Sequence, residues 1–176
     1  VYKRQQLHQM EKIAKSVQSM LSAATEDSAL ISTSLYMDNS LQDFVSRQYA
    51  SPQDYFSSYR EYIHNSLLQG VSRITNSVIR VYADNETLIN GSEFARLSTV
   101  SQEPWYQQYT ADGYSPRLLF SYDETDGRQV LFLRGMNGLY SNKAECLLCI
   151  EINYSTLDRD FQNMGYNDSV YVCLSL

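Results

Sequence analysis

A stripe of apolar side chains that repeats every seven residues occupies the start of the chain and constrains its fold most. One set of positions comprises Leu7, Ala14, Leu21, Ser28 and Leu35, and a second set, three residues further on, comprises Met10, Val17, Ala24 and Ile31. This spacing over about four heptads predicts one long helix from about residue 2 to about residue 35. Extra apolar residues at Ile13, Met20 and Leu30 suit a helix lying along its own domain, whereas the narrow seam suits a homodimer, and one helix can do both.

Residues 37–71 predict two shorter helices, the second opened by Ser51 as its cap with Pro52 at the first helical position. The spacing of the aromatic residues on this second helix puts several of them on one face. They are Tyr55, Tyr59 and Tyr62, with Ile63 beside them. We expect this face to be buried in the core.

After Gly70 the apolar period changes from about 3.5 residues to about 2. Strands are predicted at 74–82, in which Ile74 is prominent, and at 117–122, 128–135 and 144–154, the last three as an antiparallel meander. Residues 91–116 predict a short helix, a crossing segment and a second short helix that holds Trp105. Ser155 or Thr156 caps another short helix, and residues 168–176 return to a strand.

These elements predict an α+β fold, in which a long helix and two shorter helices pack with an antiparallel sheet. The change of period separates a helical region at 1–70 from a sheet module at 71–157, and a connector with a further strand follows at 158–176. A hydrophobic fraction of 43% is typical of a globular chain.

The charge of the chain excludes some classes of partner. Fourteen Lys and Arg against twenty Asp and Glu give a net charge of −6, and no basic run exceeds Lys3-Arg4. We therefore expect no nucleic-acid binding. No apolar run of the chain approaches the roughly 20 residues that span a bilayer.

No motif of catalysis or cofactor binding is visible, because the chain has no G-x-S-x-G, no Gly-rich phosphate loop and no H-E-x-x-H. His8 and His64 both fall on predicted helices, where a surface role is typical. Asp123, Glu124 and Asp126 cluster at a predicted hairpin tip, where turn formation explains them without a metal. We expect neither an enzyme nor a cofactor nor a metal site.

The three cysteines are Cys146, Cys149 and Cys173, an odd number that forms no closed disulfide framework. Cys146 and Cys149 lie three residues apart in a predicted strand, and this offset puts their side chains on opposite faces of the sheet. We expect them to be buried apolar cysteines that share neither a metal nor a bridge.

The order of these elements, with "IRVYADNETL" at the first strand, then "EPWYQQY", then "CLLCIEINYSTL" at the last strand of the meander, resembles the membrane-distal half of a double Cache domain. More narrowly, the chain resembles the extracellular sensor region of YesM-type bacterial sensor histidine kinases. The resemblance covers nearly the whole chain and depends on order and spacing. It implies a PAS-like antiparallel sheet, and it implies that residues 158–176 form a connector and the first strand of a further, membrane-proximal module. It also implies a receptor on the extracellular face of the cell membrane, with a cytoplasmic kinase and with membrane contact only through flanking transmembrane helices before Val1 and well after Leu176.

The resemblance also implies a ligand site between the segment that holds Trp105 and the open face of the sheet. Its candidate residues are Trp105, Tyr106, Tyr109, Tyr114, Arg117, Tyr122 and Arg134. For each of them a structural role stands as the alternative: Trp105 can be core, Tyr106 and Tyr109 can simply close the sheet, and the arginines can face solvent.

One departure from the family bears on the ligand. Amino-acid-binding Cache domains carry an Arg two residues before the Trp, whereas Glu103 stands there in this chain. Because a glutamate repels a carboxylate, free amino acids are disfavoured as ligands. Sugars or oligosaccharides, which stack on aromatic faces, fit the tyrosine-rich composition, with a peptide or no small ligand as alternatives. The competing function is a non-catalytic dimerisation or adaptor domain that binds a protein partner.

Overall fold

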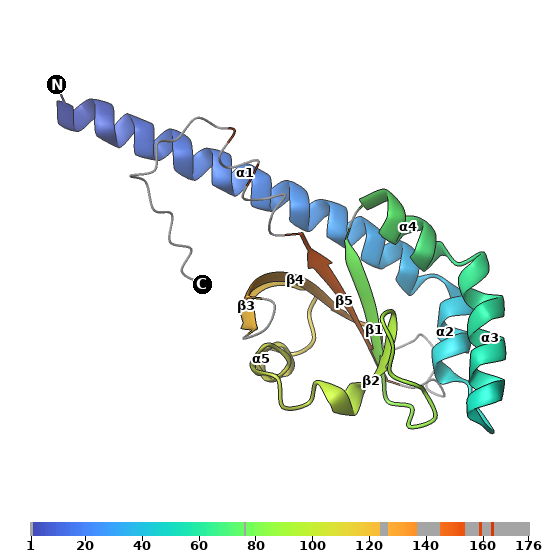
Figure 1. Cartoon of the computed structure of the whole chain (residues 1–176). Helices are drawn as coiled ribbons and strands as arrows, with labels where there is room; N and C mark the ends of the chain where they lie inside the picture. Colours follow the sequence, from blue (N-terminus) through green and yellow to red (C-terminus); the bar gives the residue numbers. More distant parts are fainter. Residues whose placement is uncertain are drawn as a thin grey trace.

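The computed structural model of this chain describes residues 2–75, 77–123, 127–136 and 145–153, together with Arg159 and Asn163. Within them a long helix and three short helices precede a five-stranded sheet, and a short 3-10 helix and a further α-helix lie between its second and third strands in the sequence (Figure 1). The predicted helix after Ser155 or Thr156, the strand at 168–176 with Cys173, and the loop residues Glu124 and Asp126 lie outside the described residues.

The predicted long helix is confirmed as α1 (Tyr2–Tyr36). Near its C-terminal end, Leu35 is fully buried and Ile31 packs against the same buried cluster. Leu7 and Met10 are instead 60% and 64% exposed, and Leu30 is 69% exposed. The expectation that Leu30 widens the buried stripe is therefore wrong.

Three short helices follow, where the sequence predicted two: α2 (Asn39–Ser46), α3 (Pro52–His64) and α4 (Leu67–Thr75). The predicted start of α3 is confirmed, because the Ser51 side chain accepts a hydrogen bond from the Asp54 amide and Pro52 is the first helical residue. The aromatic face of α3 is buried as predicted, since Tyr55, Tyr59 and Tyr62 pack in the main core.

The last of these short helices, α4, shows that the first strand starts later than predicted. Ile74, expected in a strand, lies near the end of α4 and is 85% exposed. Gly70 was interpreted as the end of a helix, but it lies inside α4, with nothing close to the position of a Cβ atom. The start of α4 does carry a signal, because the Ser66 hydroxyl accepts from the Gln69 amide, and Ser-x-x-Gln is a capping-box spacing.

The sheet consists of β1 (Val78–Ala83), β2 (Phe94–Arg96), β3 (Arg117–Asp123), β4 (Gly127–Gly135) and β5 (Cys146–Ile152), in the order β2-β1-β5-β4-β3. The meander β3-β4-β5 is antiparallel, and β5 pairs antiparallel with β1, as expected. The α+β class is therefore confirmed. The sheet is nevertheless mixed, because β2 pairs parallel with β1.

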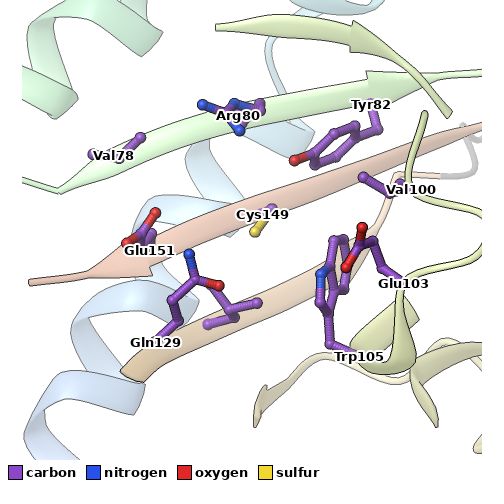
Figure 2. Close-up of a pocket in the computed structure, with 10 residues that line it drawn as sticks. Val78, Arg80, Tyr82, Val100, Glu103, Trp105, Gln129, Cys149 and Glu151 are labelled. Carbon is purple, nitrogen blue, oxygen red and sulfur yellow. The ribbon is translucent and has the colours of Figure 1, made fainter. Parts of the chain in front are cut away.

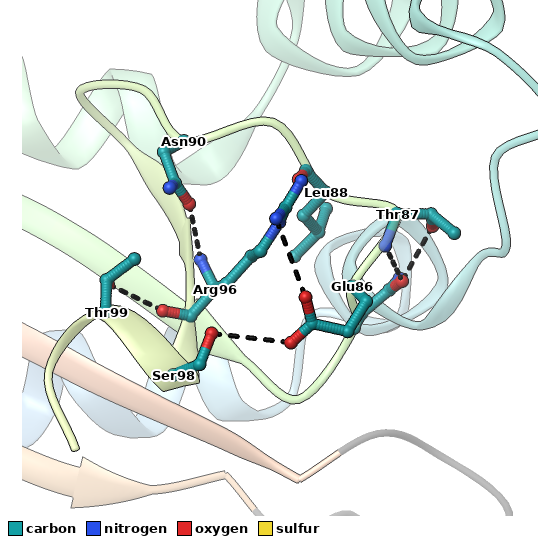
Figure 3. A network of polar contacts seen from close by, with 8 residues as sticks. Glu86, Thr87, Leu88, Asn90, Arg96, Ser98 and Thr99 are labelled. Atoms are coloured by element: carbon teal, nitrogen blue, oxygen red, sulfur yellow. Dashed lines mark hydrogen bonds and ion pairs between the residues drawn. The ribbon is translucent and has the colours of Figure 1, made fainter.

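The short strand β2 was missed because three residues are too few to show a period of two. Polar contacts centred on Arg96 hold it in place (Figure 3). Its Nε donates to the Leu88 carbonyl at 2.8 Å, its backbone amide donates to Asn90 Oδ1 at 2.9 Å, and its guanidinium lies 3.5 Å from Glu86. These contacts fold the loop between β1 and β2 back onto β2.

The two faces of the sheet bury separate clusters. Along β5, Cys146, Leu148 and Ile150 join the cluster formed with α1 to α4, whereas Leu147 and Cys149 join the cluster formed with α5 (Pro104–Ala111). Figure 1 shows α1 and α5 on opposite sides of the sheet. The prediction that Cys146 and Cys149 point to opposite faces is confirmed, and residues of both predicted regions, 1–70 and 71–157, share the first cluster.

The buried side-chain amide of one asparagine connects the helical region to the sheet by hydrogen bonds. Asn85, which follows β1 and is only 2% exposed, donates from Nδ2 to the carbonyls of Val45 at 2.9 Å and Arg47 at 2.8 Å. Its Oδ1 accepts from the Thr87 amide at 3.0 Å and from the Thr87 hydroxyl at 2.7 Å. Because both ends of the amide are satisfied, its burial costs little and joins the end of α2 to the β1–β2 loop.

We predict that Asn85→Ala lowers the free energy of unfolding by about 2–3 kcal/mol, because it leaves buried carbonyls and an amide without partners. Urea denaturation followed by circular dichroism measures this loss. Asn39→Ala, at an exposed position of α2, is the matched control and should change the free energy of unfolding by less than about 0.5 kcal/mol. Equal effects of the two substitutions would contradict the role of Asn85.

Candidate functional site

The segment that holds the only tryptophan begins with the short helix η1 (Leu97–Thr99) and continues as α5. Pro104 occupies the first turn of α5, where a missing amide proton costs nothing. Trp105 and Tyr109, four residues apart, lie on the same face of the helix and are both buried. This face of α5 covers one end of the sheet.

Tyr109 holds α5 against the sheet by hydrogen bonds, and its side chain does not line a cavity that a ligand could enter. It is completely buried, its hydroxyl accepts from the Gly135 amide of β4 at 2.7 Å, and it donates to the Tyr114 carbonyl at 2.6 Å. Both capacities of the hydroxyl are thus used within the protein. Tyr109 therefore anchors the middle of α5 to the sheet.

Arg117, at the start of β3, closes the loop that follows α5. Its Nη2 lies 2.6 Å from Asp112 Oδ2 and donates to the Gln108 carbonyl at 3.1 Å. The guanidinium also lies 5.7 Å from the centre of the Tyr109 ring. An arginine with these three partners is held as a structural brace at the C-terminal end of α5.

Tyr106 and Tyr114 lie beside this brace. Tyr114 adopts a left-handed backbone with φ of 60°, and its ring meets the Tyr109 ring edge-on at 5.7 Å. Burial, and then the neighbouring Tyr114, raise the pKa of Tyr106 to about 12. Tyr106 therefore remains neutral at physiological pH, and both tyrosines lie around the end of α5.

Tyr122 and Arg134 lie on the opposite face of the sheet from Trp105. Tyr122 follows Leu118 by four residues on β3, and Leu118 packs against the cluster of α1 to α4. Arg134 donates from Nη1 to the hydroxyls of Ser32 at 3.2 Å and Thr33 at 2.8 Å on α1. The structure thus separates these two residues from the other five candidates, because side chains alternate between the faces of a strand.

Next to Trp105 lies a cavity of about 180 Å³ on the α5 side of the sheet (Figure 2). It extends along the strands beyond the part that α5 covers. Of the seven predicted site residues, only Trp105 lines it. The full lining consists of Val78, Arg80, Tyr82, Val100, Glu103, Trp105, Gln129, Leu131, Cys149 and Glu151.

The cavity combines an apolar floor with a few polar groups, as small-molecule sites do. Trp105 is 9% exposed, and its ring lies 6.0 Å from the ring of Tyr82, tilted by 48°. In Figure 2 the indole nitrogen of Trp105 is turned toward Gln129. Within the described part of the chain, neither the indole N–H nor the Gln129 amide forms a hydrogen bond, so both remain available to a ligand.

The sequence analysis missed the strand residues of this cavity, although a signal for them exists. Arg80 and Glu151 interrupt the otherwise apolar strands β1 and β5, Gln129 lies near the start of β4, and the strand registers place all three on one face. Arg80 is opposite Cys149, and Gln129 is two residues from Leu131, which is opposite Glu151. Polar side chains in phase across neighbouring central strands indicate a face that is not fully packed.

A metal site and a membrane-spanning helix each have requirements that the described residues do not meet. No group of three or more His, Cys, Asp or Glu side chains lies close enough to hold a metal ion together. Among the helices of the described ranges, none combines the length and the hydropathy needed to cross a bilayer.

We predict that Cys149 is inert toward thiol reagents in the folded protein. Burial raises the pKa of its thiol to about 12, so the reactive thiolate is scarce at pH 8. In a Cys173→Ser background, a colorimetric disulfide reagent at pH 8 should label neither Cys146 nor Cys149 until urea unfolds the chain, and then both. Rapid labelling of one thiol in the native protein would contradict this burial.

No family model matches the chain, and no curated protein sequence matches it significantly. The assignment of a function therefore depends on the residues and geometry described above. The resemblance to double Cache sensors stays a prediction from the order of motifs.

Proposed function

We propose that this chain is the extracellular ligand-sensing domain of a membrane-bound sensor histidine kinase of the YesM type. A small molecule binds in the cavity beside Trp105 and stabilises one placement of α5 on the sheet. The resulting shift passes through α1 toward a cytoplasmic kinase. The ligand acts only through the difference in its affinity for the two placements.

The observation that carries this proposal is that β4 contacts α5 on one side of the sheet and α1 on the other side. The backbone amide of Gly135 donates to Tyr109 on α5, and the neighbouring Arg134 donates to Ser32 and Thr33 on α1. The guanidinium of Arg134 also lies 4.8 Å from the centre of the Tyr36 ring. A displacement of α5 thus has a direct physical route to α1.

A second candidate function, a dimerisation or adaptor domain, is favoured by the apolar residues that α1 leaves exposed. Leu7, Met10 and Leu30 are each at least 60% exposed. A partner that buries these residues removes apolar area from water, which stabilises the complex. This candidate becomes the better one if the chain forms a stable dimer and no small molecule stabilises it.

We predict that a thermal-shift screen of sugars, organic acids and amines contains a compound that stabilises the chain. At about 100 times its Kd, such a compound should raise Tm by roughly 5–10 °C. Trp105→Phe keeps an aromatic ring but removes the indole N–H, and should weaken binding several-fold. Tyr122→Phe, on the other face, is the matched control and should bind as the wild type does; equal binding by all three proteins would exclude Trp105 from the site.

We predict that the compound found in this way also protects the backbone of α1 near residues 28–36 from hydrogen exchange. Arg134→Ala should remove this protection at α1 and keep the protection of α5, because the guanidinium contacts to Ser32, Thr33 and Tyr36 are lost. Arg96→Ala, which disturbs β2 on the same sheet, serves as the control. If the compound protects α5 and does not protect α1 in any variant, ligand binding at the cavity remains supported and the proposed transfer of the signal through α1 is contradicted.

The encoding gene tests the receptor part of the proposal. We expect it to encode hydrophobic spans on both sides of this region and a histidine kinase core behind them. A gene that encodes a soluble protein without a kinase would contradict the proposal.

A further inference from the structure

The charges that line the cavity identify the class of ligand. Three ionisable side chains with different signs face it: Arg80 on β1, Glu151 on β5, and Glu103 at the start of α5. None of them belongs to an ion pair within the described ranges. Two carboxylates against one guanidinium leave the lining with a net charge of −1.

The single cation of the lining is already held by the protein. Arg80 Nε donates to the Ser92 carbonyl at 3.0 Å, and a hydrogen bond to the Tyr82 hydroxyl is the main cause that raises the pKa of Arg80. Its charge also acts on Glu151 across the β1–β5 pair. After this interaction, Glu103 remains without a cationic partner near Trp105.

The aromatic wall adds a second attraction for positive charge. The indole of Trp105 is the aromatic group that attracts cations most strongly through its face, and the Tyr82 ring lies 6.0 Å from it. Trp105 lines the cavity, and its indole N–H has no hydrogen-bond partner among the described residues, so the N–H can donate to an acceptor on the ligand. A neutral apolar molecule would offer no partner to the N–H or to the Glu103 carboxylate.

We infer that the ligand is a small organic cation, with an ammonium or quaternary ammonium head between Trp105, Glu103 and Glu151 and a hydrogen-bond acceptor for the indole N–H. This inference rests on the proposed function, because it names the ligand class for the same cavity. The class differs from the sugar that the tyrosine-rich sequence favours. Sugars have the donors that the carboxylates need, but they leave the negative charge of the lining unbalanced.

The size of the cavity agrees with a small ligand. At about 30 Å³ for each water of liquid, a volume of about 180 Å³ corresponds to roughly six waters. An oligosaccharide needs much more room, whereas an amino alcohol fills a space of this order. Choline is a suitable probe, because it carries a quaternary ammonium and one hydroxyl.

The test compares choline with its uncharged carbon isostere, 3,3-dimethylbutan-1-ol, at matched ionic strength. Trp105 is the only tryptophan of the chain, so its fluorescence reports on the cavity directly. We expect choline to change the Trp105 emission with a Kd at least about tenfold lower than that of the isostere. Addition of NaCl should weaken choline binding and leave the isostere unaffected.

Two substitutions that remove charge and preserve shape locate the effect. Glu103→Gln and Glu151→Gln should each weaken choline binding about three- to tenfold and should leave binding of the isostere unchanged. Glu61→Gln, on the exposed side of α3 and away from this cavity, is the matched control and should have no effect. Circular dichroism of each variant establishes that it is folded before its binding is interpreted.

The possible results separate this inference from the proposed function. Equal binding of choline and the isostere, or no response of Trp105 to choline, overturns the cationic class. Either result leaves the sensor proposal to the thermal-shift screen, which includes neutral and acidic compounds. Tighter choline binding that both glutamate substitutions leave unchanged also overturns the inference, because the cation would then bind elsewhere.

Discussion

The alternation of side chains along β4 and β5 is the constraint on which the rest of this structure depends. Every second residue faces the cluster of α1 to α4, and the residues between them face α5. The same two strands therefore bury two cores, hold the long helix and form the floor of the cavity. A shift of one residue in their register would exchange these faces, so the two cores together specify the register strongly. The Arg134 side chain reaches α1, and the backbone amide of its neighbour Gly135 bonds Tyr109 of α5, so adjacent residues of β4 contact helices on both sides of the sheet.

Much of the fold could be predicted from the chain because the periods of its apolar residues are clear. The heptad stripe predicts α1 to within two residues at each end, and the alternation after Gly70 predicts β3, β4 and β5 closely. The elements that were missed, α4 and β2, are short. Gly70 lies inside α4 and is a residue that disfavours helices, so it obscures the helical pattern there. Contacts of Arg96 with the preceding loop hold β2 in place, and no local sequence pattern reveals such contacts.

The site was predicted less well, because a pattern of residue types does not reveal which neighbours use up their polar groups. Tyr109 and Arg117 have the chemistry of ligand-binding residues, but their hydrogen bonds close the α5 segment on itself. Arg134 was assigned to the right strand and the wrong face, since the phase of a strand relative to a covering helix is a tertiary property. The residues that do line the cavity with Trp105 are polar ones inside apolar strands, and their common phase emerges only from the strand pairing.

The same geometry suggests why the cavity lies where it does. Tyr109 anchors the middle of α5 by a hydrogen bond to a backbone amide, whereas Trp105, one turn earlier, touches the sheet only by ring packing. In the proposed function, a ligand that replaces part of this packing displaces the start of α5 about a fixed point four residues away. Such a motion would keep the backbone hydrogen bonds of the sheet. The strand that carries the fixed point also carries Arg134, so β4 connects the anchored point of α5 to the contacts with Ser32 and Thr33 on α1.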